Sequence, residues 1–241
     1  MQATLLTTER TELPFVPVEA HGASCRAPEA RDWFLALRHA QVRFHPEDRL
    51  LLLYGHPLVF RLGLYAAGER VLSGEPIVYL DGAHTFDPFF IGRMARAHRR
   101  QPRSLLSMIH VARAFSCHQL ERLISNCLLS ALERYESHLA IVSGLFDTFY
   151  DEAVPDHEAL RLFGRVMDAS HKLTQHGFTM LFLCPQVPML TRGSRRSLDQ
   201  MRGQADRVIR VEEAQGVVSL HDEGESTGAQ WEFPRTVLDL S

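Results

Sequence analysis

Residues 50–62 read LLLLYGHPLVFRL, and this stretch decides the fold class because it joins two different patterns. Leu50 to Tyr54 is a continuous apolar run that ends at Gly55, which is the pattern of a strand buried on both faces. The chain from Leu58 to Leu72 then has the length and composition of a helix. The stretch therefore predicts a strand, a tight turn and a helix that covers a parallel sheet.

The same alternation continues along the chain. Further buried strands are predicted at 76–80, 109–113, 138–142 and 179–183, and helices at 88–98, 117–137 and 157–177. Near the end, Arg207–Val211 and Val217–Leu220 predict an antiparallel hairpin. The expected fold is α/β, with a mostly parallel central sheet that the C-terminal antiparallel hairpin closes at one edge.

The N-terminal region follows another pattern. Residues 1–28 lack sustained periodicity and predict an extended arm. Residues 28–44 predict a helix, because Pro28 lies near its start, Trp33, Phe34, Leu37 and Val42 fit one apolar face, and Pro46 stops it. We therefore divide the chain into an N-terminal arm and helix, residues 1–46, and a core domain, residues 47–241.

The composition predicts a soluble intracellular protein. Hydrophobic residues make up 45% and charged residues 23% of the chain, and the formal net charge of −3 gives no overall attraction to nucleic acid or anionic membranes. The four cysteines form no CxxC pair, and no secretory signal or apolar run of about 20 residues is present. These features favour a reduced, cytoplasmic compartment and no membrane partner.

Lys172 is the only lysine among the 26 basic side chains. Its surroundings contain neither the glycines nor the preceding strand of a phosphate-binding loop. The sequence therefore excludes an intact P-loop enzyme and leaves Lys172 as the only residue that could form a Schiff base.

Three short motifs occur in order along the predicted core. Residues 79–86 read YLDGAHTF, residues 111–119 read VARAFSCHQ and residues 185–187 read PQV. They resemble "YIDTEGTF", "ARAFNxxHQ" and "NQV" of the RecA/RadA recombinase family, and the resemblance spans about residues 48–220. It implies a RecA-like three-layer fold, the P-loop NTPase fold, in a protein of DNA recombination and repair.

The resemblance also implies where the nucleotide would bind, and most of those positions have changed. Where the family has GxxxxGK[ST], this chain keeps Gly55, places Phe60 at the second glycine and Arg61 at the lysine, and has Leu62 in place of the metal-binding hydroxyl. Ala83 aligns with the general-base glutamate, and Ser143 with the aspartate that positions Mg²⁺. These changes describe a degenerate pseudo-ATPase site without the usual hydrolytic groups.

Two further sites follow from the resemblance. Gln186 matches a glutamine that couples nucleotide state to DNA binding, although a polar cap at a strand end explains it equally well. Of the two regions that would contact DNA, 149–158 is acidic, whereas a loop beginning at residue 191 is basic and glycine-containing. The DNA-binding candidates there are Arg192, Arg195, Arg196 and Arg202, and the alternative for them is a solvated helix face or loop.

Other chemistries have weaker support. Acidic residues and His84 near strand ends could form a carboxylate site, but Asp87 before Pro88 is better explained as a helix N-cap. A zinc site from Cys117, His118 and Cys127 lacks the usual ligand spacing.

The sequence thus predicts a catalytically degenerate RecA/RadA-like protein, an accessory or scaffold in DNA recombination or repair with weak DNA binding. We expect no cofactor, a protein partner or a second copy of this chain, and no membrane. One alternative is a nucleotide-binding ATPase in which Arg61 replaces the lysine and ATP binds with Mg²⁺. Another is a regulatory interaction domain that binds neither DNA nor ATP.

Overall fold

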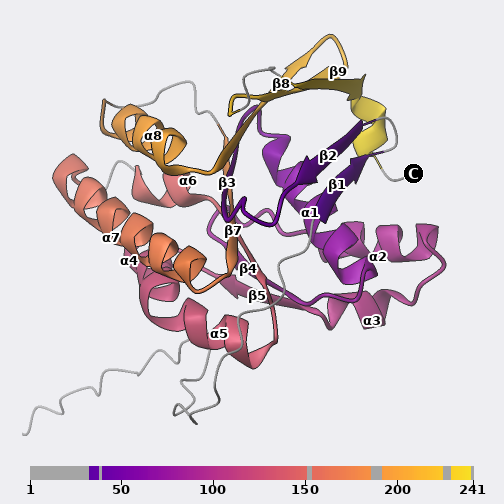
Figure 1. The fold of residues 1–241 in the computed structure, drawn as a ribbon, viewed down its shortest axis with the longest axis horizontal. Coiled ribbons are helices and arrows are strands. Elements are labelled where there is room, and N and C mark those ends of the chain that lie inside the picture. Colours follow the sequence, from indigo (N-terminus) through magenta and orange to yellow (C-terminus); the bar gives the residue numbers. More distant parts are fainter. Residues whose placement is uncertain (1–32, 38–39, 151–153, 186–191, 225–228, 240–241) are drawn as a thin grey trace, which may run out of the picture.

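The computed structural model describes residues 33–37, 40–150, 154–185, 192–224 and 229–239. They form a central sheet with helices on both faces and a separate two-stranded sheet (Figure 1). The arm predicted over residues 1–28 lies outside the described residues.

The central sheet has eight strands in the order β10-β9-β8-β3-β7-β6-β4-β5. The strands from β8 to β5 are parallel to their neighbours, whereas β9 is antiparallel to β8 and β10 to β9. The α/β class, the mostly parallel sheet and the antiparallel hairpin are confirmed, and β10 extends the hairpin by one strand that the sequence analysis missed. The strands are β3 (Leu50–Gly55), β4 (Ile77–Asp81), β5 (Ile109–Arg113), β6 (Leu139–Ser143), β7 (Thr179–Pro185), β8 (Arg207–Ala214), β9 (Val217–Asp222) and β10 (Gln230–Pro234).

Two sets of helices cover the two faces of the sheet. One face packs against α1 (Val59–Leu72), α2 (Pro88–Ala97) and α3 (Pro102–Leu106). The other face packs against α4 (Cys117–Arg122), the π-helix η1 (Leu123–Cys127), α5 (Leu128–Arg134), α6 (Leu145–Phe149), α7 (Asp156–Gln175) and α8 (Arg192–Gln204). A short 3₁₀ helix, η2 (Arg235–Leu238), follows β10. The layers are therefore helix, sheet and helix, and the short α3 and α6 had not been predicted.

The apolar run that opens β3 supplies both cores. Side chains alternate along a strand, so Leu51 and Leu53 enter the core beneath α1, whereas Leu50, Leu52 and Tyr54 enter the core beneath α7 and α8. A strand buried on both faces needs apolar residues at every position, which explains why the sequence shows a continuous run.

The helix predicted over residues 28–44 is wrong where the chain is described. The structure instead has β1 (Trp33–Leu37) and β2 (Ala40–Phe44), paired antiparallel. In β2, Val42 and Phe44 are buried while Arg43 between them is exposed, which is the period of two of a strand. Aromatic and β-branched residues also favour a strand, and this preference outweighs the approximate helical spacing.

The basic loop predicted from residue 191 is also wrong, because α8 begins at Arg192. Ser194, Ser197, Leu198 and Met201 are buried at the three- and four-residue spacing of one helix face. Glycine and arginine content suggested a loop, but the burial of this face determined a helix.

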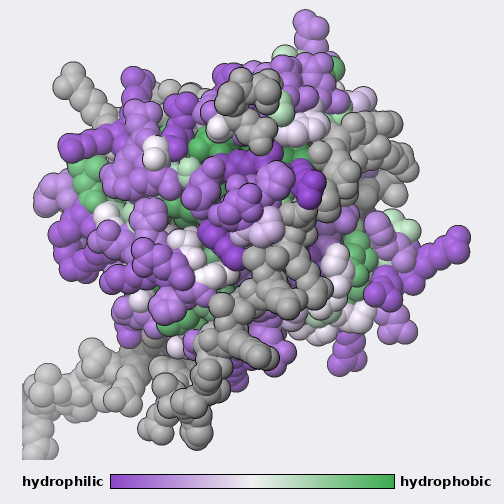
Figure 2. Space-filling view, viewed as in Figure 1, coloured by the Kyte–Doolittle hydropathy of each residue, from purple (hydrophilic) through white to green (hydrophobic). Residues whose placement is uncertain are grey.

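The surface in Figure 2 is mostly hydrophilic, and its hydrophobic residues appear in small separate areas.

Candidate functional site

The turn between β3 and α1 is where the resemblance places a phosphate-binding loop. Gly55 ends β3 with φ of +117°, a conformation that favours glycine. A Cβ at this position would lie closer than 3.0 Å to the carbonyl oxygen of Val211 in β8. The His56 N–H donates to that same oxygen at 2.8 Å. The turn is thus held tightly against β8.

The backbone N–H groups that follow His56 have acceptors within the turn. The Leu58 N–H donates to His56 Nδ1 at 3.3 Å, the Val59 N–H to His56 O at 3.0 Å, and the Phe60 N–H to Pro57 O at 3.2 Å. Pro57 has no N–H to offer. A phosphate nest needs several backbone N–H groups that converge on an empty space. These N–H groups instead close the first turn of α1.

Arg61 does not face this turn. Its guanidinium lies over the Phe90 ring, 4.8 Å from the centroid, and its Nη1 is 4.0 Å from Asp87 Oδ2. Asp87 caps α2 by accepting hydrogen bonds from the N–H groups of Phe89 and Phe90, so its predicted capping role is confirmed. Arg61 therefore contacts the N-terminus of α2. Phe60 is partly buried against the core of α1, and Leu62 is fully buried.

The ends of β4 and β6 are joined through a buried carboxylate. Asp81 Oδ1 accepts hydrogen bonds from the Thr85 N–H at 2.9 Å and from the Ser143 hydroxyl at 3.0 Å. Asp81 Oδ2 accepts from the Phe86 N–H at 3.2 Å and lies 3.6 Å from Arg113 Nε. Because each oxygen already has two partners, Asp81 organises the loop after β4 and is not a free base.

The backbones beside this carboxylate leave no space between them. Gly144 has a positive φ of 75°, and a Cβ there would meet the backbone of Gly82 and Ala83. The Gly82 N–H donates to Ser143 O at 2.9 Å. Ala83 and Ser143 thus lie side by side. The resemblance aligns them with a glutamate and an aspartate, but they present a methyl group and a hydroxyl that is already bonded.

A cavity of about 880 Å³ opens beside the turn between β3 and α1. It lies between the turn, the end of β8 and α8, outside the carboxyl ends of two parallel strands, which is where ligands usually bind in open α/β sheets. Charged groups of both signs line it: Arg195, Asp199 and Arg202 from α8, Arg210, Glu212 and Glu213 from β8, and His56 from the turn.

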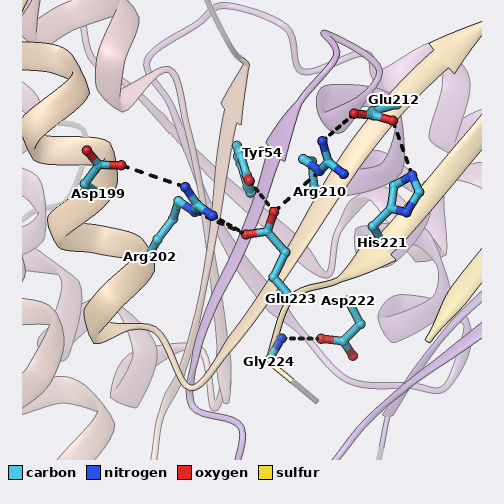
Figure 3. A network of polar contacts seen from close by, with 9 residues as sticks. All are labelled: Tyr54, Asp199, Arg202, Arg210, Glu212, His221, Asp222, Glu223 and Gly224. Carbon is cyan, nitrogen blue, oxygen red and sulfur yellow. Dashed lines mark hydrogen bonds and ion pairs between the residues drawn. The ribbon is translucent and has the colours of Figure 1, made fainter. Parts of the chain in front are cut away.

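Glu223 organises one wall of this region (Figure 3). It accepts hydrogen bonds from the Tyr54 hydroxyl at 2.5 Å and from Arg202 Nη2 at 2.7 Å, and it lies 3.4 Å from Arg210 Nε. Burial, reinforced by the bond to Glu223, raises the pKa of Tyr54 well above its usual value. Tyr54 therefore stays protonated and donates to Glu223.

This network decides which arginines remain available. Arg202 is bound by Glu223 and lies 3.8 Å from Asp199, and its guanidinium covers the Tyr54 ring at 5.1 Å. Arg195 and Arg196 are exposed and have no ion-pair partner among the described residues. The side chains of Arg192 and Gln186 lie outside the described residues.

The sequence analysis missed Tyr54, Arg210 and Glu223 as a group. Tyr54 is the second-last residue of β3, Arg210 lies within β8 and Glu223 follows β9, so these residues are up to 169 positions apart. Only the pairing of β8 with β3 and β9 brings them together, and no local motif signals it.

Two broader features concern ligands and membranes. Among the described residues, no group of His, Cys, Asp and Glu side chains is arranged to hold a metal ion. The described helices include none whose length and hydropathy would allow it to cross a bilayer.

No protein-family model and no curated protein matches this chain. The function must therefore be inferred from its own residues.

Proposed function

We propose that this chain is a RecA/RadA-like protein without ATPase chemistry, which acts as an accessory or scaffold in DNA recombination or repair. The observation that carries the proposal is the closed turn after β3. The N–H groups of Leu58, Val59 and Phe60, which would face a phosphate in a P-loop, are bonded within the turn. A nucleotide would have to break these bonds before it could gain new ones.

The recombinase-like part of the proposal rests on where the three motifs lie. Residues 79–81 end β4 and 82–86 follow it, residues 111–113 end β5 and 114–119 follow it, and Pro185 ends β7, while residues 186–187 lie outside the described residues. Where they are described, the motifs lie at the carboxyl ends of strands of one parallel sheet, and this arrangement supports the proposal.

The loss of catalysis rests on three positions. Arg61 lies over Phe90 and pairs with Asp87, so it is directed away from the turn. Ala83 has no acidic group, and Ser143 donates its hydroxyl hydrogen to Asp81. Phosphoryl transfer needs a phosphate cradle, a metal anchor and a group that positions the nucleophile. Because each of the three is missing or otherwise engaged, we expect neither ATP nor Mg²⁺ to act as a cofactor.

Calorimetric titration of the full chain with ATP and Mg²⁺ tests the loss of nucleotide binding. We expect no binding heat at micromolar to millimolar nucleotide. The matched variant is Arg61→Ala, which tests the alternative in which Arg61 replaces the lysine. If the wild-type protein binds ATP with micromolar affinity and Arg61→Ala does not, the alternative is correct and our proposal is wrong.

The DNA part of the proposal rests on Arg195 and Arg196, two exposed cations without an ion-pair partner among the described residues. Fluorescence anisotropy with a labelled single strand, repeated over a salt series, measures their contribution. Each phosphate contact contributes about 0.7 to the slope of log K against log salt. The double variant Arg195→Ala/Arg196→Ala should therefore lower the slope by about 1.4.

The control pair is Arg99→Ala/Arg100→Ala, because both of these arginines are also exposed. It should leave the slope unchanged. If wild-type protein binds no DNA even at low salt, the chain is an interaction domain without a nucleic-acid role, which is the second alternative.

A further inference from the structure

Two phenylalanine rings are unusually exposed for a folded protein. Phe115 is 74% exposed and Phe89 is 77% exposed, the two largest values among the exposed large hydrophobic side chains of the described chain. Phe115 follows β5, which is an edge strand of the sheet, and no strand of the described residues covers its outer side. A single exposed apolar side chain is normal on a protein surface, so the case for a site depends on the groups around Phe115.

The Phe115 ring is attached to a rigid frame. The backbone N–H of Phe115 donates to Gln119 Oε1 at 2.7 Å, and the backbone N–H of the preceding Ala114 donates to Asp81 O at 3.3 Å. The next residue, Ser116, caps α4 by accepting a hydrogen bond from the Gln119 N–H. The backbone of Phe115 is thus bonded on both sides, so binding of a ligand to its ring would not have to order the backbone.

The Phe115 ring also has an aromatic neighbour. The His84 imidazole lies 4.6 Å from it, centroid to centroid, with 31° between the planes. His84 has a positive φ of 55°, which is uncommon for a residue with a side chain. The loop after His84 is fixed because Asp81 accepts the N–H groups of Thr85 and Phe86. Such local strain is often found at binding sites.

A cation, Arg113, lies two residues before Phe115 in the sequence. Arg113 ends β5, its side chain is 53% exposed, and its Nε lies 3.6 Å from Asp81 Oδ2. Its Nη groups have no acceptor in the described part of the chain. An arginine with free Nη groups can bind a phosphate through two parallel hydrogen bonds. One aromatic ring with a neighbouring imidazole and a free guanidinium is the combination that binds single-stranded nucleic acid through base stacking and phosphate contacts.

From this arrangement we propose that Phe115, His84 and Arg113 form a binding site for single-stranded DNA, in which a base stacks on Phe115 and a phosphate binds Arg113. The inference rests on the proposed DNA role and names a second contact region, on β5 instead of α8. The core of a protein interface would need a contiguous apolar surface. Ala114 and Cys117 are buried, and the neighbours of Phe115 that reach the surface are instead polar or charged: Arg113, Ser116, Gln119 and His84.

The test measures how the full chain binds a labelled oligo-dT strand and the same strand with abasic sites. We expect Phe115→Ala to weaken oligo-dT binding by roughly 5- to 150-fold, the effect of one lost stacking contact. Binding of the abasic strand should change little, because it has no base to stack. The matched control is Phe89→Ala, which removes an equally exposed ring that has no aromatic partner among the described residues.

Two further variants separate the base from the phosphate. Phe115→Trp should keep the affinity, and its fluorescence should be quenched on oligo-dT, measured against the background of Trp33 and Trp231. Arg113→Gln should reduce the salt slope by about 0.7 and keep the preference for strands with bases.

Several results would overturn the inference. If the wild-type protein binds oligo-dT but Phe115→Ala binds it equally well, the site is wrong while the DNA role on α8 stands. If Phe115→Ala instead changes only the oligomeric state in light scattering, the ring is a protein contact. If wild-type protein binds no single strand, the site and the DNA role are both wrong, and the ATP titration still tests the loss of nucleotide binding independently. Thermal unfolding of each variant shows whether it remains folded.

Discussion

The closed turn after β3 makes a prediction about stability, because the turn depends on Gly55. The change Gly55→Ala introduces a Cβ that would meet the carbonyl oxygen of Val211 at less than 3.0 Å. It also places alanine at φ of +117°, a region that side chains rarely adopt. We expect the free energy of unfolding to fall.

The magnitude has two parts. A residue with a side chain in a disfavoured backbone region costs about 1–3 kcal/mol. Forcing an extra carbon into a packed contact costs roughly another 1–3 kcal/mol, because the backbones of β3 and β8 must separate. The total is about 2–6 kcal/mol, which urea unfolding followed by circular dichroism measures readily.

The chain offers two matched glycines. Gly74 also has a positive φ, of 85°, but nothing lies within 4 Å of its Cβ position, so Gly74→Ala isolates the backbone part at about 1–2 kcal/mol. Gly164 lies in α7 with open space around it, so Gly164→Ala should raise stability by up to about 1 kcal/mol. If Gly55→Ala costs no more than Gly74→Ala, the turn is not held against β8 and the closed-turn argument against nucleotide binding fails.

Two further predictions concern buried charged and titratable groups. Arg207 is buried and pairs with Asp222 at 2.7 Å and with Asp48 at 3.3 Å. Because Arg207→Ala leaves two carboxylates without their cation, it should lower the free energy of unfolding in urea by about 3–5 kcal/mol. A loss below about 1 kcal/mol would contradict this. Burial lowers the pKa of His110 and His138 below the ordinary value, so the unfolded chain binds more protons near pH 6 and unfolding free energy should decrease as the pH falls from 7 to 5. His138→Gln should make that decrease shallower, and an unchanged slope would refute the contribution of His138.

The sequence predicted the parallel strands well because a strand buried on both faces leaves a continuous apolar run. Strand β5 was predicted with its observed bounds, and β3 to within one residue. Prediction from the sequence failed where the strand period of two residues and the helix period of about 3.6 residues had to be distinguished over a short segment. Trp33 to Phe44 fitted a helix approximately, and only pairing between β1 and β2 selects the strand. At α8, basic composition hid the helical spacing of Ser194, Ser197, Leu198 and Met201.

The candidate sites divide in the same way. Comparison with the family motifs shows three replacements in the sequence itself: Arg61 stands at the lysine, Phe60 at the second glycine and Ala83 at the acidic residue. The direction of Arg61, the stacking of His84 on Phe115 and the network around Glu223 could not be predicted from the sequence, because each depends on residues that different elements bring together.

What the sequence alone determined, then, is the class of the fold and the chemical groups that a nucleotide site would lack. Both the fold class and the missing groups depend on residue types at short spacing, so they can be predicted without knowledge of long-range contacts. Only the tertiary structure decided that the N–H groups after β3 are already bonded and that Arg202 is held by Glu223 while Phe115 and Arg113 are exposed. The availability of a donor, a cation or a ring depends on its neighbours in space, and these neighbours come from distant parts of the chain.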